Sequence, residues 1–323
     1  MTLKEYIYHC FVVMGWHQGL FHNAEYKLEK EYYITSNTCY KDHHKTIIFM
    51  VDGRFIHGGL ADRIKGMVSL YAICLKHHWD FKINFIYPFQ LTDYLIPQKH
   101  NWLIKPEEID YNNKNSAPVL LNSYQLPTKF HEAYLIKRMI GKKQLHLYSE
   151  SPWGENRFSE LFNQLFQPSE KLLQDINTNK KNIGKKYISA TFRFQQLLGD
   201  FKEGNYPILP NEQKQTLIKQ CLQKIEELHL QYSEFKILIT ADSPSFLKLV
   251  DELPYTYIIP GTVVHMDYTN NASFITYEKS FLDYFLIANA EKIHLIYNNQ
   301  MYRSGFAKQA SLLYNHPYIE IQF

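Results

Sequence analysis

The stretch that decides the fold runs Gly53-Arg54-Phe55-Ile56-His57-Gly58-Gly59-Leu60-Ala61-Asp62-Arg63. It follows the apolar run 46–51 and precedes a segment, 64–75, with apolar residues at helical spacing. A strand, a glycine loop and a helix in this order bring backbone N–H groups and the positive end of a helix dipole together. The stretch therefore predicts an anion-binding turn. It fits neither G-x-G-x-x-G nor G-x-x-x-x-G-K-[ST], and glycines that serve only a tight turn are an equal alternative.

The rest of the chain alternates strand-like and helix-like patterns, which predicts helices layered on parallel sheets. A polar, lysine-rich stretch, 168–186, divides the alternation and predicts a linker. The predicted fold is α/β, with two Rossmann-like domains, 1–180 and 181–323, facing each other across a cleft. We expect strands at 46–51, 81–86, 102–104, 118–121, 144–148, 187–193, 235–240, 257–260 and 292–297, and helices at 62–77, 132–137, 157–166, 210–229, 244–252, 278–289 and 305–313.

The composition excludes several classes of protein. A net charge of +3 over 323 residues is too small to favour nucleic acid, although it is compatible with peripheral contact with an anionic membrane. The four cysteines are scattered without a C-x-x-C pair, which favours reduced thiols. Because no segment has 18 consecutive apolar residues, we expect a cytoplasmic protein without a membrane span. The oligomeric state does not follow from these features.

Ligands of parallel sheets bind beyond the carboxyl ends of the strands, so the loops there carry the candidate chemistry. Arg193 ends a predicted strand, where its guanidinium can bind a phosphate group through two hydrogen bonds. Asp200 and Glu203 follow in the same loop, and either carboxylate can accept a proton from an attacking hydroxyl group. A plain salt bridge between Arg193 and Asp200 is the structural alternative.

Two further loops follow predicted strands. Asp242 is placed to bind a base or a ribose hydroxyl, whereas Ser243 before Pro244 is explained by capping of a helix N-terminus. Ser304 and Gly305 begin another helix and offer a second anion cradle. The chain has no His-x-x-x-His, D-x-D or carboxylate cluster with metal-ligand spacing, so we expect neither a metal nor a cofactor.

In this order the loops resemble the motifs of the fucosyltransferase superfamily, which includes the α1,2- and α1,6-fucosyltransferases and the protein O-fucosyltransferases. Gly53-Arg54-Phe55 with Gly58 to Asp62 is similar to the family's N-terminal glycine motif. Arg193 matches the arginine of H-x-R-R-x-D, and residues 240–248 resemble T-D-D-P-S-L-L-K. Residues 281–307 resemble the third motif. The chain differs from the family in having Thr191 in place of His, a longer spacing to Asp200 and no second Asp in the T-D-D motif.

The resemblance implies a GT-B enzyme that transfers fucose from GDP-fucose with inversion and without a metal. It assigns catalytic roles to Arg193, Asp200 and Glu203, with Arg193 on the diphosphate. It implies a glycan acceptor, with bacterial surface polysaccharide by analogy, and a loss of transfer in Arg193→Ala with the fold intact. The residues that it places around the donor are Gly58, Gly59, Asp62, Arg193, Asp242, Ser243, Asp283, Ser304, Gly305 and Phe306, with His57 and Arg63 as second-line candidates.

Three other functions compete with this hypothesis. The differences from the family motifs leave a glycosyltransferase with another nucleotide sugar open. They equally leave open a non-catalytic carbohydrate-binding relative, against which the retained Arg193 and Asp200 argue. A nicotinamide-dependent oxidoreductase is disfavoured because the dinucleotide fingerprint is absent.

Overall fold

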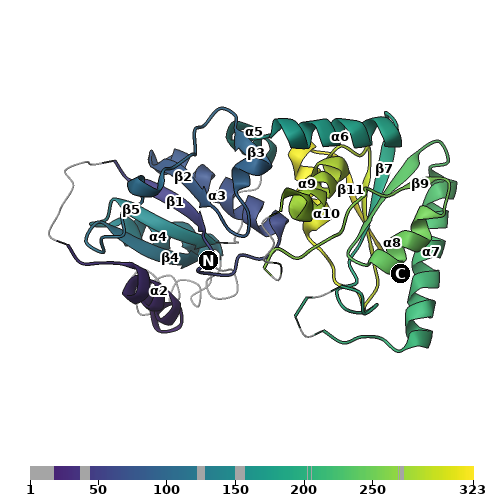
Figure 1. Cartoon of the computed structure of the whole chain (residues 1–323), viewed down its shortest axis with the longest axis horizontal. Helices are drawn as coiled ribbons and strands as arrows, with labels where there is room; N and C mark the ends of the chain where they lie inside the picture. Colours follow the sequence, from purple (N-terminus) through teal and green to yellow (C-terminus); the bar gives the residue numbers. More distant parts are fainter. Residues whose placement is uncertain are drawn as a thin grey trace. The chain divides into compact units, whose positions relative to one another are not determined.

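The structure is a computed structural model that describes residues 18–36, 44–121, 128–149, 157–201, 203–204, 206–267, 269 and 273–323. Cys10 and Cys39 lie outside these ranges. The chain divides into two compact units (Figure 1). The first unit falls within 1–58, 62–90 and 97–167, and the second comprises 59–61, 91–96 and 168–323.

The first unit is built on a four-stranded sheet of order β2-β1-β5-β4, in which every pair of neighbours is parallel. Helix α2 is joined to the edge strand β4 by a hydrogen bond. The carboxylate of Glu25 in α2 accepts the backbone N–H of Leu120 in β4 at 2.9 Å. The elements in chain order are α2 (Gln18–Tyr32), β1 (Thr46–Val51), α3 (Leu60–His77), β2 (Asp80–Phe85), η2 (Pro106–Glu108), β4 (Ser116–Leu121), η3 (Thr128–Phe130), α4 (His131–Met139), β5 (Gln144–Ser149) and α5 (Phe158–Leu165).

The second unit is built on a parallel five-stranded sheet of order β11-β10-β7-β8-β9. Helices α9 and α10 lie on one side of its strands and α7 and α8 on the other (Figure 1). The elements are α6 (Glu170–Ile183), β7 (Tyr187–Phe192), α7 (Asn211–Gln231), β8 (Lys236–Ala241), α8 (Pro244–Asp251), β9 (Thr256–Tyr257), α9 (Phe274–Ala288), β10 (Ile293–Tyr297), α10 (Phe306–Tyr314) and β11 (Tyr318–Gln322). The short elements η1 (Leu91–Asp93), β3 (Leu95–Pro97) and β6 (Phe166–Pro168) precede α6, and β3 pairs with β6.

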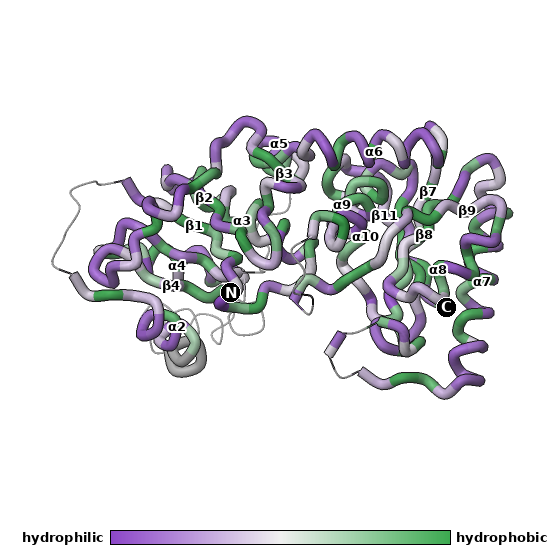
Figure 2. Tube along the Cα trace, in the orientation of Figure 1, coloured by the Kyte–Doolittle hydropathy of each residue, from purple (hydrophilic) through white to green (hydrophobic). Residues whose placement is uncertain are grey.

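Hydropathy explains why these segments form their elements. All six residues of β7 are buried, and so are five of the six in β1 and in β8. Such runs suit the centre of a parallel sheet that is covered on both faces. Helix α7 alternates between hydrophobic and hydrophilic segments along its length, and it buries Leu217, Cys221, Ile225 and Leu228 (Figure 2). The core of the second unit therefore forms between α7, α8 and the strands β7 and β8.

The predicted alternation of strands and helices is confirmed for most of the chain, with two corrections. Residues 102–104 form no strand, although Trp102 is buried. The predicted linker, 168–186, contains helix α6, so the predicted domain boundary after residue 180 falls inside a helix. Ser169 caps α6 by accepting the N–H of Leu172, and the helix buries Leu172, Ile176 and Ile183. This cap and this apolar spacing were the signals of a helix within a lysine-rich segment.

Candidate functional site

Arg193 directly follows β7, and its guanidinium is held by two carboxylates. Nη1 lies 3.0 Å from Oδ2 of Asp242, and Nη2 is paired with Oε2 of Glu203. The ring of Phe201 packs against the guanidinium, 4.8 Å from its central carbon. The predicted alternative, a salt bridge to Asp200, is therefore wrong. Arg193 is positioned by charge and by an aromatic ring on the second unit.

Asp242 is the group that fixes this arrangement. The register of the parallel pair β7–β8 sets Phe192 opposite Ala241, so Arg193 and Asp242 emerge side by side at the same edge of the sheet. The carboxylate accepts the backbone N–H groups of Phe194 at 2.8 Å and Gln195 at 2.7 Å. Burial raises the pKa of Asp242, while Arg193 and the two N–H groups act in the opposite direction. Asp242 thus organises the turn after β7.

The structure separates the two candidate bases, Asp200 and Glu203. Oδ2 of Asp200 accepts the Ser243 hydroxyl at 2.7 Å, and it accepts the backbone N–H and hydroxyl of Ser245 at 2.8 and 2.6 Å. Asp200 therefore binds the N-terminus of α8, where a negative charge is favoured. Glu203 instead lies at Arg193, with Oε1 3.6 Å from Nε2 of His265. Burial and the charge of Asp242 raise the pKa of Glu203, against the effect of Arg193.

Ser243 is the N-cap of α8, as the sequence predicts. Its hydroxyl oxygen accepts the N–H of Phe246 at 3.2 Å, and Pro244 occupies the first turn. The side chain of Ser243 is also fully buried. These contacts assign Ser243 to the local structure of the strand-to-helix turn.

The N-terminus of α10 lies beside the Arg193 loop. Gly305 is the N-cap of this helix, and the Ser304 hydroxyl accepts the N–H of Phe306 at 3.2 Å. The backbone N–H of Tyr302 donates to the carbonyl oxygen of Arg193 at 3.1 Å, which joins the two loops. In this sheet β7 lies between β8 and β10. Helices α7 and α9 cover opposite faces of the sheet (Figure 1). The order in which the chain adds strands therefore changes direction between β7 and β10. Such switch points are where open α/β sheets bind ligands.

Asp283 lies within α9 and forms an internal ion pair. Its Oδ1 is 2.9 Å from Nζ of Lys279, one helical turn earlier, and both side chains are almost fully buried. Burial raises the pKa of Asp283, partly offset by Lys279. A Cβ atom built on Gly261 would come within 3.3 Å of Cβ of Lys279, so α9 packs closely against the loop that contains Gly261. Asp283 thus has an intramolecular partner, and its contact with the nucleoside stays a prediction.

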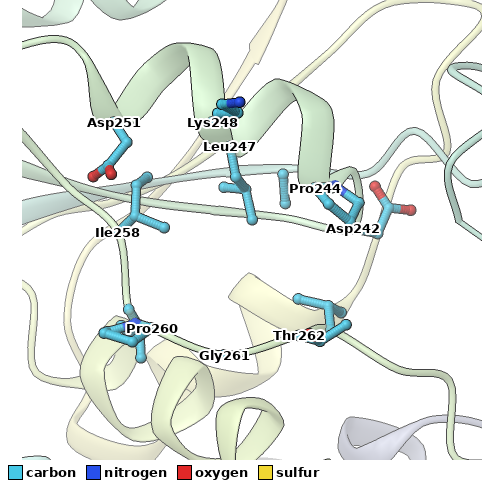
Figure 3. Close-up of a pocket in the computed structure, with 12 residues that line it drawn as sticks. Asp242, Pro244, Leu247, Lys248, Asp251, Ile258, Pro260, Gly261 and Thr262 are labelled. Atoms are coloured by element: carbon cyan, nitrogen blue, oxygen red, sulfur yellow. The ribbon is translucent and has the colours of Figure 1, made fainter.

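A cavity of about 260 Å³ opens between α8 and residues 258–263 (Figure 3). Leu247 and Ile258 form an apolar wall, Gly261 contributes backbone, and Asp242 lies at one end. Because Asp242 also pairs with Arg193, the cavity adjoins the Arg193 cluster. Sequence reasoning missed this cavity, since the strand predicted at 257–260 ends at Tyr257 and residues 258–263 instead form a loop.

The predicted glycine turn lies between β1 and α3, and its binding of an anion stays a prediction. Gly53 and Gly58 adopt positive φ angles of 83° and 73°, which favour glycine. The buried guanidinium of Arg63 holds the loop, with Nε donating to the Gly58 carbonyl at 3.0 Å. Asp62 forms an ion pair with Lys65 at 2.7 Å on the surface of α3.

His57, the other second-line candidate, is buried beside Phe49 and Tyr148. Burial lowers the pKa of His57 to about 3, and the nearby charge of Arg63 acts in the same direction. His57 is therefore neutral at physiological pH. Together with Arg63, it belongs to the framework of the loop.

Among the residues that the structure describes, no cluster of three or more His, Cys, Asp or Glu side chains has the arrangement of a metal site. Within the same residues, no helix combines the length and the apolar character needed to cross a membrane.

The two parallel sheets and their helices form an α/β fold of two Rossmann-like units, and comparison with known proteins supports this fold. No model of a known protein family matches the chain, and no curated protein matches it in sequence. The fold is similar to that of fucosyltransferase NodZ from Bradyrhizobium, with a TM-score of 0.57, 11% identity, and coverage of 87% of this chain and 96% of that chain. A NodZ α1,6-fucosyltransferase soaked with GDP-fucose gives a TM-score of 0.55 at 10% identity, covering 86% and 95%.

A variant of FUT1 from Arabidopsis thaliana in complex with GDP is also similar, with a TM-score of 0.54, 11% identity, and coverage of 93% of this chain and 74% of that chain. Together these similarities confirm the predicted α/β fold of two Rossmann-like units, which is similar to the fold of these solved fucosyltransferases. At such low identity they show the fold alone.

Proposed function

We propose that this protein is a metal-independent, inverting glycosyltransferase that transfers fucose from GDP-fucose to a hydroxyl group of a glycan. The observation that carries the proposal is the position of Arg193 beside the N-terminus of α10, at the switch point of the second sheet. A guanidinium and a helix N-terminus both bind phosphate groups, and together they suit a diphosphate. The similarity of the fold to fucosyltransferase structures supports the same class of donor.

In this mechanism the nucleoside diphosphate leaves as the acceptor oxygen attacks the opposite face of the sugar. The bond from the anomeric carbon to the acceptor oxygen forms, and the bond to the diphosphate oxygen breaks. Arg193 and the backbone N–H groups of Ser304 and Gly305, at the start of α10, stabilise the charge that develops on the diphosphate. Glu203 accepts the proton of the acceptor hydroxyl, since Asp200 is already bound to the N-terminus of α8.

The nucleoside has a candidate binding site in the cavity between α8 and residues 258–263 (Figure 3). Leu247 and Ile258 offer apolar contact to the faces of a base, and the backbone around Gly261 offers hydrogen bonds to its edge. Asp242 connects this cavity with Arg193, so one donor molecule can contact both.

A second candidate is a glycosyltransferase with a different nucleotide sugar. It is favoured by two contacts at positions where the family resemblance implies donor recognition. Thr191 is buried, with its hydroxyl bonded to that of Thr240 at 2.9 Å. Asp283 is bound to Lys279. Neither side chain offers a free polar group for recognition of the donor. The two candidates therefore differ in the nucleobase of the donor that the site binds.

Thermal unfolding with GDP, UDP and CMP, and then with the corresponding nucleotide sugars, tests both candidates. A ligand at 100 times its Kd stabilises the folded state by about 2.7 kcal/mol, which is readily measured. We expect GDP and GDP-fucose to give the largest shift, and GDP-fucose to be hydrolysed or transferred. A larger shift with UDP or CMP would select the second candidate. Stabilisation by GDP-fucose without any turnover would identify a non-catalytic relative.

A further inference from the structure

The two carboxylates on Arg193 are anchored in different ways. Asp242 is 2% exposed and is fixed by two backbone N–H groups. Glu203 belongs to a loop between Gly199 and Gly204, which adopt φ angles of 83° and 58°. Among the described residues, its carboxylate meets only the side chains of Arg193 and His265. Asp242 is therefore a permanent counter-ion of Arg193, whereas Glu203 is held by side-chain contacts alone.

The backbone of the loop is fixed separately from the carboxylate of Glu203. The side-chain amide of Gln196 donates to the carbonyl oxygens of Glu203 at 2.9 Å and Gly204 at 2.8 Å. Rotation of the Glu203 side chain can therefore change its partner without moving these backbone bonds.

His265 is placed to receive that carboxylate. Its Nδ1 accepts the backbone N–H of Asp267 at 3.3 Å, so in the neutral ring the proton is on Nε2. Nε2 is 3.6 Å from Oε1 of Glu203, slightly beyond hydrogen-bond distance. A small rotation of Glu203 away from Arg193 would complete this bond.

We propose that Glu203 occupies the place of the donor diphosphate on Arg193 and exchanges to His265 when the diphosphate binds. His265 is thus a positioning residue, which holds the released carboxylate ready to accept the proton of the acceptor. The inference rests on the proposed binding of a diphosphate at Arg193. Electrostatics favour the exchange, because two carboxylates and a diphosphate on one guanidinium would place like charges together.

Titration calorimetry with inorganic pyrophosphate tests the exchange without any assumption about the nucleobase or the sugar of the donor. We expect Glu203→Gln to bind pyrophosphate about tenfold more tightly, because an intramolecular competitor is lost. His265→Ala should bind it about fivefold more weakly, because the released carboxylate loses its partner. His265→Gln, which keeps an N–H donor, should restore part of this loss. Glu212→Gln, at an exposed position of α7, is the matched control and should bind like the wild type.

The double variant Glu203→Gln with His265→Ala separates exchange from simple structural damage. If His265 acts through Glu203, removing His265 has no further effect once Glu203 is neutral, and the double variant binds like Glu203→Gln. Equal weakening in both backgrounds would overturn the proposal, as would unchanged or weaker binding by Glu203→Gln alone. Failure of the proposed function has a different signature, in which neither the wild type nor Glu203→Gln binds pyrophosphate or GDP.

Discussion

Oδ2 of Asp242 lies 3.0 Å from Nη1 of Arg193, and this contact ties together the ends of the neighbouring parallel strands β7 and β8. It gives the guanidinium a fixed direction at the switch point of the sheet. Because Asp242 is almost fully buried, it also makes Arg193 part of the fold. The predictions below follow from this double role and from the contacts around it.

Replacing Arg193 should separate its binding role from its structural role. Arg193→Lys keeps a positive charge near Asp242 but loses the planar pair of donors, so we expect donor binding to weaken by about 2 kcal/mol, roughly thirtyfold in Kd. Arg193→Ala leaves a buried carboxylate without its counter-ion and should cost about 3 kcal/mol of unfolding free energy. The loss of transfer in Arg193→Ala stays a prediction, and the folded state is expected to be less stable. Titration calorimetry with GDP measures the change in donor affinity, and unfolding in urea measures the change in stability. Full donor affinity in Arg193→Lys would show that Arg193 is not part of the binding site.

Asp200 and Glu203 should respond differently to mutation. Asp200→Ala removes the acceptor at the N-terminus of α8 and should lower the unfolding free energy by about 1–2 kcal/mol, with a modest effect on kcat. Glu203→Gln should lower kcat strongly while the melting temperature stays near that of the wild type. Melting curves and single-turnover transfer measured on both variants compare these effects. A strong loss of kcat in Asp200→Ala, with only a small loss in Glu203→Gln, would make Asp200 the catalytic base.

Gly66 and Gly59 form a matched pair for the glycine loop and its helix. A Cβ atom on Gly66 would meet the carbonyl oxygen of Ser149 at 2.7 Å and the ring of Phe49 at 3.0 Å. Gly66→Ala should therefore destabilise the chain by about 1–3 kcal/mol despite the better helix propensity of Ala. Gly59→Ala meets nothing within 4 Å and should unfold like the wild type. Any loss of donor binding in Gly59→Ala then reports directly on the predicted role of this loop.

The stability of the folded chain should depend on pH through Glu278 of α9. Burial and a hydrogen bond with Asp175 raise the pKa of Glu278 from 4.5 to about 7. A carboxyl group with a raised pKa binds its proton more tightly in the folded state, so its contribution is complete below pH 4.5 and is lost as the pH rises through 7. In Glu278→Gln this part of the pH dependence should disappear. Melting temperatures of both proteins between pH 4 and 8 measure it, and parallel curves would contradict the assignment.

The sequence predicted the alternation of elements because buried strands and amphipathic helices have strong local patterns. Residues 46–51 were predicted as a strand with the exact bounds of β1, and the cap at Ser243 was predicted from its Pro neighbour. The sequence does not predict helix α6, because the polar, lysine-rich composition of residues 168–186 outweighs three well-spaced apolar residues. Strand β11 was not predicted, and its identity depends on pairing with β10.

For the candidate site, the sequence by itself determined which residues follow the strands, because strand ends are marked by local hydropathy. It therefore indicated Arg193, Asp242 and the start of α10 as neighbours of a sheet edge. Only the tertiary structure decided their partners. That Arg193 pairs with Glu203 and Asp242, that Asp200 binds the N-terminus of α8, and that Lys279 pairs with Asp283 depend on strand register, loop path and burial. Such contacts are set by the energy of buried charges in three dimensions, which no local pattern of residues records.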